Sequence, residues 1–280
     1  MSKYSYRTFG YIPSYSLKTN LCCFLFGVPN IFKRLQGKKI LSSLDIHDKE
    51  KILDFGCGSG YLTVELYRAG AEAFGLDVNK MPTHTALREC YNIPITIVNS
   101  GENSPYEDNY FDKILASEIL PMISDPKNFL IELKRLLKPS GFLSIVNGFG
   151  HPAIEKFYQK KGLFFRILNK LYKKEFPPTY LEYTKLINKS FGTSQHNFLS
   201  LQTIINMLNE LGFEIREVAS SMKEPVSATL SFVQFFWHLK NGKAILPSWM
   251  FYFLYPILKV INFLSKEDCS NHLIITAIKK

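Results

Sequence analysis

Two carboxylates and a short run of glycines stand close together in the first third of the chain. Asp54 comes two positions before Gly56, and Asp77 follows seventeen residues after Gly60. Every second residue from Gly56 to Gly60 is a glycine, which lets the backbone take positive φ angles and lets a ligand approach without Cβ atoms in the way. Residues of these types at this spacing predict a binding site whose floor is main chain.

The elements around these residues would place them at one edge of a sheet. Lys51–Phe55 is a short apolar run typical of a buried strand, and Tyr61–Arg68 continues as a helix that Gly70 can end. Ala71–Leu76 predicts a second strand, with Asp77 at its carboxyl end. In an open parallel sheet, that end is where ligands bind.

The run from Asp54 to Gly60, together with Asp77, resembles motif I and the acidic motif II of the class I S-adenosylmethionine-dependent methyltransferases, close to the type 11 group. The acid before the first glycine and the spacing to Asp77 carry the resemblance. A nicotinamide dinucleotide-binding fold is the competing interpretation, since its fingerprint is G-x-G-x-x-G with an acid about 20 residues later. Tyr61 stands where the third glycine of that fingerprint belongs, which favours the methyltransferase.

The resemblance implies an α/β, Rossmann-like fold with a seven-stranded, mostly parallel sheet and helices on both faces. Its last strand would run antiparallel between the fifth and the sixth. The remaining predicted elements follow in the family's order. They are helices over Met81–Cys90, Pro126–Leu137 and Ser200–Leu211, and strands over Ile93–Asn99, Tyr110–Ala116, Leu143–Asn147, Phe213–Ala219 and His272–Lys279.

Two insertions lengthen the chain beyond a minimal domain of this family. Residues 148–198 and 220–271 each follow a parallel strand at its carboxyl end, so topology places both over the pocket as a helical cap that would bind the substrate. Residues 1–50 would form an N-terminal helical cover, with a helix over Pro29–Leu44. Residues 51–280 would form the methyltransferase domain.

The resemblance assigns eight residues to the binding of S-adenosylmethionine: Asp54, Gly56, Gly58, Gly60, Asp77, Ser100, Gly101 and Ser117. Asp77 would accept hydrogen bonds from both ribose hydroxyls, and Asp54 would help to hold the amino group. Ser100 stands where the family often has an adenine-binding aspartate, so backbone groups at Gly101 become part of the expected adenine contact. No cluster of His, Cys and Asp has the spacing of metal ligands, and no metal is expected.

A general base is needed only if the acceptor is a hydroxyl whose proton must leave. Glu118 and His151 are the candidates, followed by His196, because all three are expected at the carboxyl edge of the sheet. Each has a plainer interpretation: Glu118 could cap the next turn, and either histidine could lie on the surface. Pro121 and Met122 stand where many relatives have a Glu-His pair, so no histidine base is expected there.

Most of the positive charge lies outside the glycine-rich region. The net charge is +10; residues 1–50 carry 8 basic and 3 acidic groups, residues 51–150 carry 9 and 12, and residues 151–280 carry 17 and 9. Lys156–Lys174 holds seven basic residues, no acid and apolar residues at helical spacing, which is typical of a helix at an anionic membrane surface. Solvated lysines are the alternative. The aromatic residues occur in aliphatic runs without a recognisable nucleic-acid module, which disfavours nucleic acid as a partner.

Leu246–Leu264 is apolar over 19 residues, about the length that spans a bilayer. Pro256, Lys259 and Asn262 lie inside it and argue against a spanning helix, so peripheral lipid contact or a hydrophobic substrate tunnel is expected. Five cysteines without metal or disulfide spacing indicate reduced thiols. We therefore expect a cytoplasmic protein with peripheral contact at the inner face of the membrane.

Together these features predict a methyltransferase that acts on a hydrophobic small-molecule or lipid-linked acceptor. RNA or protein as the acceptor is one alternative, because the flanks are basic. A protein that binds S-adenosylmethionine without turnover is another, because Ser100 and the missing Glu-His pair depart from the family pattern.

Overall fold

The computed structural model describes most of the predicted core and part of the second insertion. The described residues are Ile12, 31–101, 103–148, 199–223, 225–227, 229–230, 232–233, 237, 248–266, 268 and 272–280. Residues 149–198, which make up nearly all of the first insertion, lie outside this set, as does most of the chain before residue 31.

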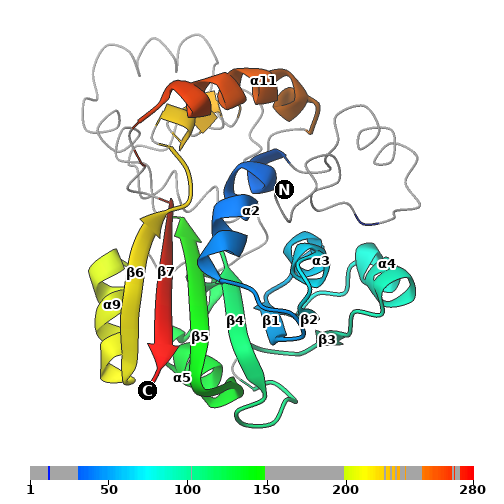
Figure 1. The fold of residues 1–280 in the computed structure, drawn as a ribbon, viewed down its shortest axis with the longest axis vertical. Helices are drawn as coiled ribbons and strands as arrows, with labels where there is room; N and C mark the ends of the chain where they lie inside the picture. Colours follow the sequence, from blue (N-terminus) through cyan, green and yellow to red (C-terminus); the bar gives the residue numbers. More distant parts are fainter. Residues whose placement is uncertain are drawn as a thin grey trace, which may run out of the picture.

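One seven-stranded sheet organises the molecule (Figure 1). Its strands are β1 (Lys51–Phe55), β2 (Glu72–Asp77), β3 (Ile95–Ile97), β4 (Phe111–Ser117), β5 (Leu137–Gly148), β6 (Phe213–Ser220) and β7 (His272–Lys279). Their order is β3-β2-β1-β4-β5-β7-β6. Strand β7 pairs antiparallel with both β5 and β6, while the other neighbouring pairs are parallel. The predicted fold class is confirmed, including the antiparallel last strand between the fifth and the sixth.

Helices cover both faces of the sheet. They are α2 (Ile31–Ser43), α3 (Tyr61–Arg68), α4 (Pro82–Tyr91), α5 (Pro126–Leu136), α9 (Leu201–Glu210) and α11 (Ser248–Leu264), with a short 3-10 turn η1 (Leu120–Met122). Alternate residues of the strands face opposite sides, as a pleated strand requires. Ile52 therefore joins the apolar cluster that α2, α3 and α4 complete, whereas its neighbour Leu53 joins the cluster under α5 and α9.

The observed bounds differ from the predicted ones mainly at two strands. Strand β3 is three residues long and begins only at Ile95. Ile93 cannot join it, because its N–H donates to the Leu87 carbonyl (3.1 Å) at the end of α4. Pro94 has no N–H to give to a ladder. Strand β5 is longer than predicted, because pairing resumes at Leu137, opposite Phe111, before the turn and continues to Gly148.

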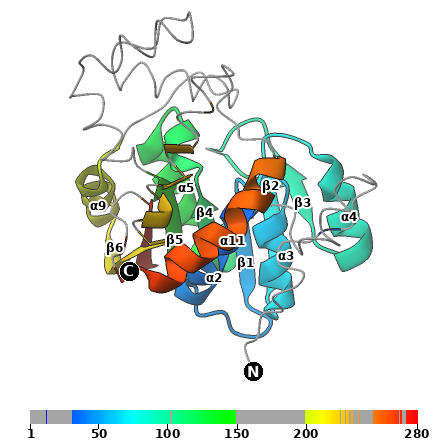
Figure 2. The same ribbon diagram turned by 90° about the horizontal axis from the view of Figure 1, so that it is seen from above.

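Helix α11 lies across α2 above the sheet (Figure 2), and the two helices are in contact. Leu254, Leu258 and Ile261 on its inner side pack with apolar residues that follow β6, among them Met222 and Val226. The helix has 17 residues and contains Pro256. Within the part of the chain that the structure describes, no helix is both long enough and apolar enough to cross a membrane.

Candidate functional site

The glycine loop between β1 and α3 has the backbone that the sequence predicts. Gly56, Gly58 and Gly60 all have positive φ angles, of 74°, 53° and 77°. A Cβ on Gly56 would lie 2.5 Å from the Ile119 side chain, and a Cβ on Gly60 would collide with Leu87. A Cβ on Gly58 would meet no atom within 4 Å. Two of these glycines therefore allow close packing within the protein, while Gly58 leaves space beside the loop for a ligand.

Asp77 closes β2 and holds the glycine loop in place. Its Oδ2 accepts a hydrogen bond from the Gly58 N–H (2.7 Å), and its Oδ1 accepts one from the Asn79 N–H (2.8 Å). The side chain is 9% exposed. Each carboxylate oxygen has a second acceptor position, so these two bonds leave Asp77 able to accept from a ligand as well.

Asp54 lies at the other side of the loop, buried to 2% exposure, where its Oδ2 accepts a hydrogen bond from the Thr63 hydroxyl (2.6 Å). The negative charge of Asp54 affects the pKa values of two neighbouring side chains. Burial, together with Asp54 and Asp77, raises the pKa of the Cys57 thiol. Burial, together with Asp54 and Glu118, raises the pKa of the Tyr61 phenol. Both groups therefore stay neutral, and Cys57 has no thiolate chemistry to offer.

His84 supports the glycine loop from α4, a role that the sequence analysis did not assign. Its Nδ1 accepts a hydrogen bond from the Met81 N–H (3.3 Å), so its Nε2 carries the hydrogen and donates to the Gly58 carbonyl (2.7 Å). The side chain is buried. The Gly58 backbone is therefore held at both ends of the residue, by Asp77 at its N–H and by His84 at its carbonyl. A histidine in the first turn after the acidic strand end was the only signal in the sequence.

Ser100 and Gly101 follow β3, and Gly101 lies next to Phe55, the residue before the glycine loop. A Cβ on Gly101 would be 3.4 Å from the Phe55 ring, which ends β1, and 3.3 Å from Ile123. Gly101 is thus placed beside the end of β1, at the edge where the family resemblance puts the adenine.

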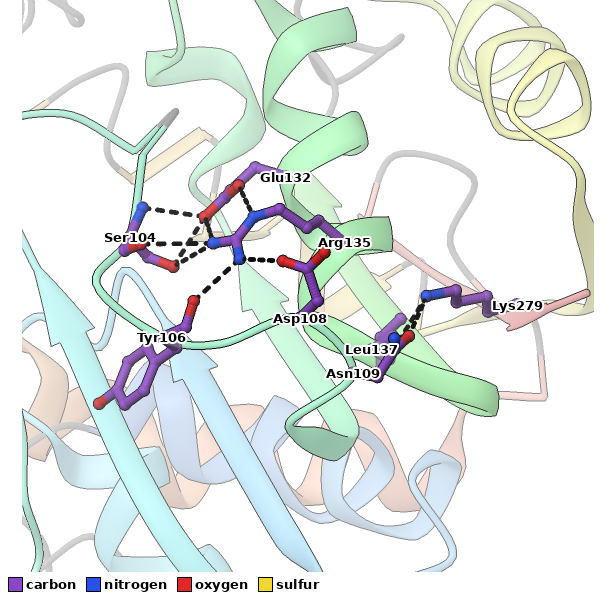
Figure 3. Close-up of polar contacts among 8 residues, drawn as sticks. All are labelled: Ser104, Tyr106, Asp108, Asn109, Glu132, Arg135, Leu137 and Lys279. Atoms are coloured by element: carbon purple, nitrogen blue, oxygen red, sulfur yellow. Dashed lines mark hydrogen bonds and ion pairs between the residues drawn. The ribbon is translucent and has the colours of Figure 1, made fainter.

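An ion pair on α5 fixes the loop that carries these two residues (Figure 3). The Arg135 guanidinium contacts Glu132 Oε1 and Asp108 Oδ1, each at 2.7 Å, and donates to the Tyr106 carbonyl (2.9 Å). Glu132 Oε1 also accepts from the Ser104 N–H (2.9 Å) and hydroxyl (2.7 Å). Burial alone would raise the pKa of Glu132, but Arg135 and the Ser104 donors hold it below its ordinary value. The sequence does not predict this network, because strand β4 separates the loop residues from Glu132 and Arg135 on α5.

Ser117 and Glu118 end β4 at the same edge. Ser117 is buried, and its hydroxyl has no hydrogen-bond partner among the described residues. Glu118 has a left-handed backbone (φ 59°), and its Oε2 accepts a hydrogen bond from the Gly148 N–H (2.9 Å) at the end of β5. Glu118 therefore caps the end of the neighbouring strand β5. His151 and His196 lie outside the described residues.

These features fit the cofactor that the sequence resemblance implies. The open side of Gly58 is a cradle that a Cβ would fill, and the Ser117 hydroxyl is a buried polar group without a protein partner in the described part of the chain. Asp54 and Asp77 supply acceptors on either side of the cradle. No group of three or more His, Cys, Asp or Glu residues within the described ranges is arranged to hold a metal ion.

Comparisons with known proteins point to the same group of enzymes. Residues 53–145 match the family described as "Methyltransferase domain". A demethylmenaquinone methyltransferase of Staphylococcus saprophyticus is 26% identical over 189 residues, which cover 65% of this chain and 78% of that protein. A ubiquinone biosynthesis O-methyltransferase of Proteus mirabilis is 35% identical over 104 residues, which cover 35% of this chain and 42% of that protein.

Solved structures share the fold at low sequence identity. An S-adenosylmethionine-dependent methyltransferase from Mesorhizobium loti has a TM-score of 0.56 at 16% identity, covering 89% of this chain and all of that one. The [4+2]-cyclase SpnF has a TM-score of 0.54 at 17% identity, covering 87% of this chain and 80% of that one. At this level of identity the likeness concerns the fold.

Proposed function

Residues 53–145 belong to a class I S-adenosylmethionine-dependent methyltransferase domain, and we propose that the chain transfers the methyl group to a hydrophobic, quinone-type small molecule. The similarity to two proteins named for menaquinone and ubiquinone methylation carries this proposal. The large apolar content of the segment beyond β6, which includes α11, supports a hydrophobic acceptor.

We assign the cofactor contacts residue by residue. The glycine loop would form the floor, with the open side of Gly58 facing the ligand, and Asp77 would take the ribose hydroxyls. Ser117 and Asp54 would bind the methionine end. Ser100 and Gly101 would flank the adenine.

When bound, S-adenosylmethionine supplies an already activated methyl group on a sulfonium. The chain then contributes mainly by positioning the acceptor in line with that group, an effect worth up to about 7–11 kcal/mol in well-oriented systems. The residues named above are suited to this task because three separate strand ends, at Phe55, Asp77 and Ser117, hold them at one edge of the sheet.

The decisive experiment incubates the protein with labelled methyl donor and a fractionated cell extract. Label is expected in the solvent-extractable fraction, in a quinone-type compound. Label in RNA or in protein instead would contradict the proposal, and binding of the donor without any transfer would favour a binding protein.

A pair of glycine variants tests whether the open side of Gly58 binds the cofactor, with Gly212→Ala as the control for Gly58→Ala. Gly58→Ala and Gly212→Ala both place alanine at a positive φ angle, of 53° and 78°, which costs roughly 1–2 kcal/mol of stability. Gly212 lies between α9 and β6, away from the site. We expect Gly58→Ala to abolish measurable binding of S-adenosylmethionine in calorimetry, while Gly212→Ala binds it like the wild type.

We further propose that α11 rests on the membrane that holds the acceptor, at its cytoplasmic face. Ile257, Val260, Phe263 and Leu264 on this helix are 55%, 57%, 86% and 71% exposed. Leu254, Leu258 and Ile261 form the packed side of the helix. At 3.6 residues per turn, Phe263 lies opposite that side, Val260 lies between, and Ile257 and Leu264 lie on its flank. The excess of basic residues in 151–280 would favour anionic lipid.

Vesicle sedimentation tests the membrane proposal. The wild type should bind anionic vesicles at low salt, and the double variant Phe263→Ser, Leu264→Ser should lose most of that binding. Ile131→Ser, at a 45% exposed position on α5, is the matched control and should bind like the wild type. Absence of wild-type binding at low salt, where attraction to anionic lipid is strongest, would remove the proposal.

A further inference from the structure

A histidine that the sequence analysis did not select stands at the carboxyl edge of the sheet. His272 is the first residue of β7, and it pairs with Gly148, the last residue of β5. Because β7 runs antiparallel to β5, its first residue lies where the parallel strands end. The other described histidines lie elsewhere, His47 in the turn before β1 and His84 on α4.

The His272 ring is placed beside a carboxylate and a buried amide. Its Nδ1 is 3.7 Å from Glu118 Oε1 and 3.5 Å from the Nε2 of Gln36 on α2. Gln36 is fully buried. The imidazole Nδ1 can therefore accept a hydrogen bond from Gln36 in one tautomer. The Glu118 carboxylate, at 3.7 Å, is an electrostatic neighbour that favours a hydrogen on Nδ1.

The supports of this ring are themselves fixed. Glu118 is held through Oε2 by the Gly148 N–H (2.9 Å). The His272 carbonyl accepts from both the N–H (2.8 Å) and the hydroxyl (3.1 Å) of Ser221. The Ser221 hydroxyl in turn accepts from Gln36 Nε2 (3.2 Å), which orients the amide toward both residues. Histidine, carboxylate and amide thus form one connected group drawn from β7, the end of β4 and α2.

This group is continuous with the cofactor site. Ile119, the residue after Glu118, packs against the position where Gly56 would carry a Cβ. The charge of Glu118 also reaches the buried Tyr61 phenol, which Asp54 affects from the other side. The His272–Glu118 pair therefore adjoins the glycine loop, at the edge of the sheet where the proposed binding sites for the methyl donor and the acceptor would meet.

We propose that His272 is the general base of the methyl transfer and that Glu118 is its positioning residue, an inference that rests on the proposed function. The acceptor's O–H or acidic C–H bond breaks, and the proton goes to Nε2 of His272. The electron pair left on the acceptor forms the bond to the methyl carbon. The bond from that carbon to the sulfonium sulfur breaks, and its electrons stay on sulfur.

Glu118 performs the positioning part of this step. A carboxylate beside Nδ1 favours the tautomer with hydrogen on Nδ1, which leaves Nε2 unprotonated, and it stabilises the imidazolium that forms. A positive φ at a non-glycine residue has an energetic cost, and such residues cluster at functional sites. The proposal gives His272 the role for which the sequence analysis named Glu118 and His151 as candidates, and it gives Glu118 a positioning role instead.

The test uses the full chain and a hydroquinone with a short isoprenoid side chain as the probe acceptor. His272→Ala and His272→Asn should lower kcat on the order of 100-fold. Their affinity for S-adenosylmethionine, measured by calorimetry, should stay within twofold of the wild type. Added imidazole should restore part of the activity of His272→Ala, which a merely structural role would not allow. His47→Ala, at an exposed histidine, is the matched control and should keep full activity.

A second measurement does not depend on turnover. In nitrogen-15 NMR of histidine-labelled protein, Glu118→Gln should shift the His272 ring signals toward the other tautomer. An unchanged spectrum overturns the proposal that Glu118 orients His272. Wild-type kcat in both His272 variants overturns the proposal that His272 is the general base. If the wild type binds the donor but methylates no phenolic or quinol probe, the proposed function has failed, and the NMR result alone then decides whether Glu118 orients His272.

Discussion

At the scale of single residues, the floor of the proposed cofactor site depends on one glycine, Gly58, whose backbone two elements hold. The Gly58 N–H is bound by Asp77 from β2, and its carbonyl is bound by His84 from α4. Since Gly58 is the loop glycine with open space beside it, we expect these two side chains to set the orientation of its backbone toward a ligand.

Replacement of His84 tests this dependence. His84→Leu leaves the Gly58 carbonyl without its donor, and we expect the loss of this bond, worth about 1–2 kcal/mol, to raise the Kd for S-adenosylmethionine roughly 5- to 30-fold. His84→Gln keeps an N–H group that can reach the same carbonyl and should recover most of the affinity. Calorimetric titration distinguishes the two, and equal weakening in both variants would show that His84 acts only through packing.

Residues of the site differ in how far the sequence could reveal them. The glycines, Asp54 and Asp77 lie within one short stretch, so their spacing alone predicts that they meet, and the structure brings them together. His84, Arg135 and His272 are useful only through contacts with segments far away in the chain. No local pattern marks such residues, because the sequence around a histidine or an arginine does not show which distant segment its side chain contacts.

At the scale of elements, α2 is the helix that covers the first apolar face of the sheet beside the site. Its inner side buries Ile40 and Leu41 completely, while Lys39 forms an ion pair with Asp268 on the outside. The ion pair is 42% and 56% exposed at its two side chains. Buried aliphatic side chains, and not the ion pair, should therefore hold this helix.

Two substitutions on α2 separate these contributions. Leu41→Ala should reduce the free energy of unfolding by about 2–5 kcal/mol, because it removes a fully buried side chain and leaves a cavity. Lys39→Ala should cost less than about 1 kcal/mol, since exposed ion pairs are worth little. Urea denaturation measures both. A Lys39→Ala loss as large as that of Leu41→Ala would mean that the outer contacts hold α2.

The bounds of helices and strands were predicted correctly where a clear apolar run is delimited by residues that end such elements. Strand β1, helix α3 and strand β7 have the predicted bounds, since glycines or polar residues delimit clear apolar runs. Strand β5 was predicted too short, because its first pairing partner, Phe111, belongs to a strand that precedes it by a whole helix. Register of this kind is decided by the neighbouring strand and cannot be derived from the segment itself.

At the scale of the whole molecule, two carboxylates tie stability to pH. Arg135 and Ser104 outweigh burial and lower the pKa of Glu132, and Lys138 with the Lys51 N–H does the same for the pKa of Asp112. A carboxyl whose pKa is lower in the folded state adds stability above its unfolded pKa, and this stability is lost as pH falls through the folded value. The protein should therefore lose stability progressively below about pH 4.5, where free carboxyls begin to protonate.

Glu132→Gln separates the contribution of one carboxylate from the rest. At neutral pH the variant should be less stable than the wild type by about 1–3 kcal/mol, because the Arg135 guanidinium loses its charged partner. As the pH falls below about 4.5 and through the lowered pKa of folded Glu132, the two stability curves should converge, since wild-type Glu132 then becomes protonated as well. Urea denaturation across this range measures the difference, with Glu210→Gln, at a 61% exposed side chain, as the control expected within about 0.5 kcal/mol of the wild type. Parallel curves for Glu132→Gln and the wild type would show that this ion pair does not couple the loop between β3 and β4 to the stability of the fold.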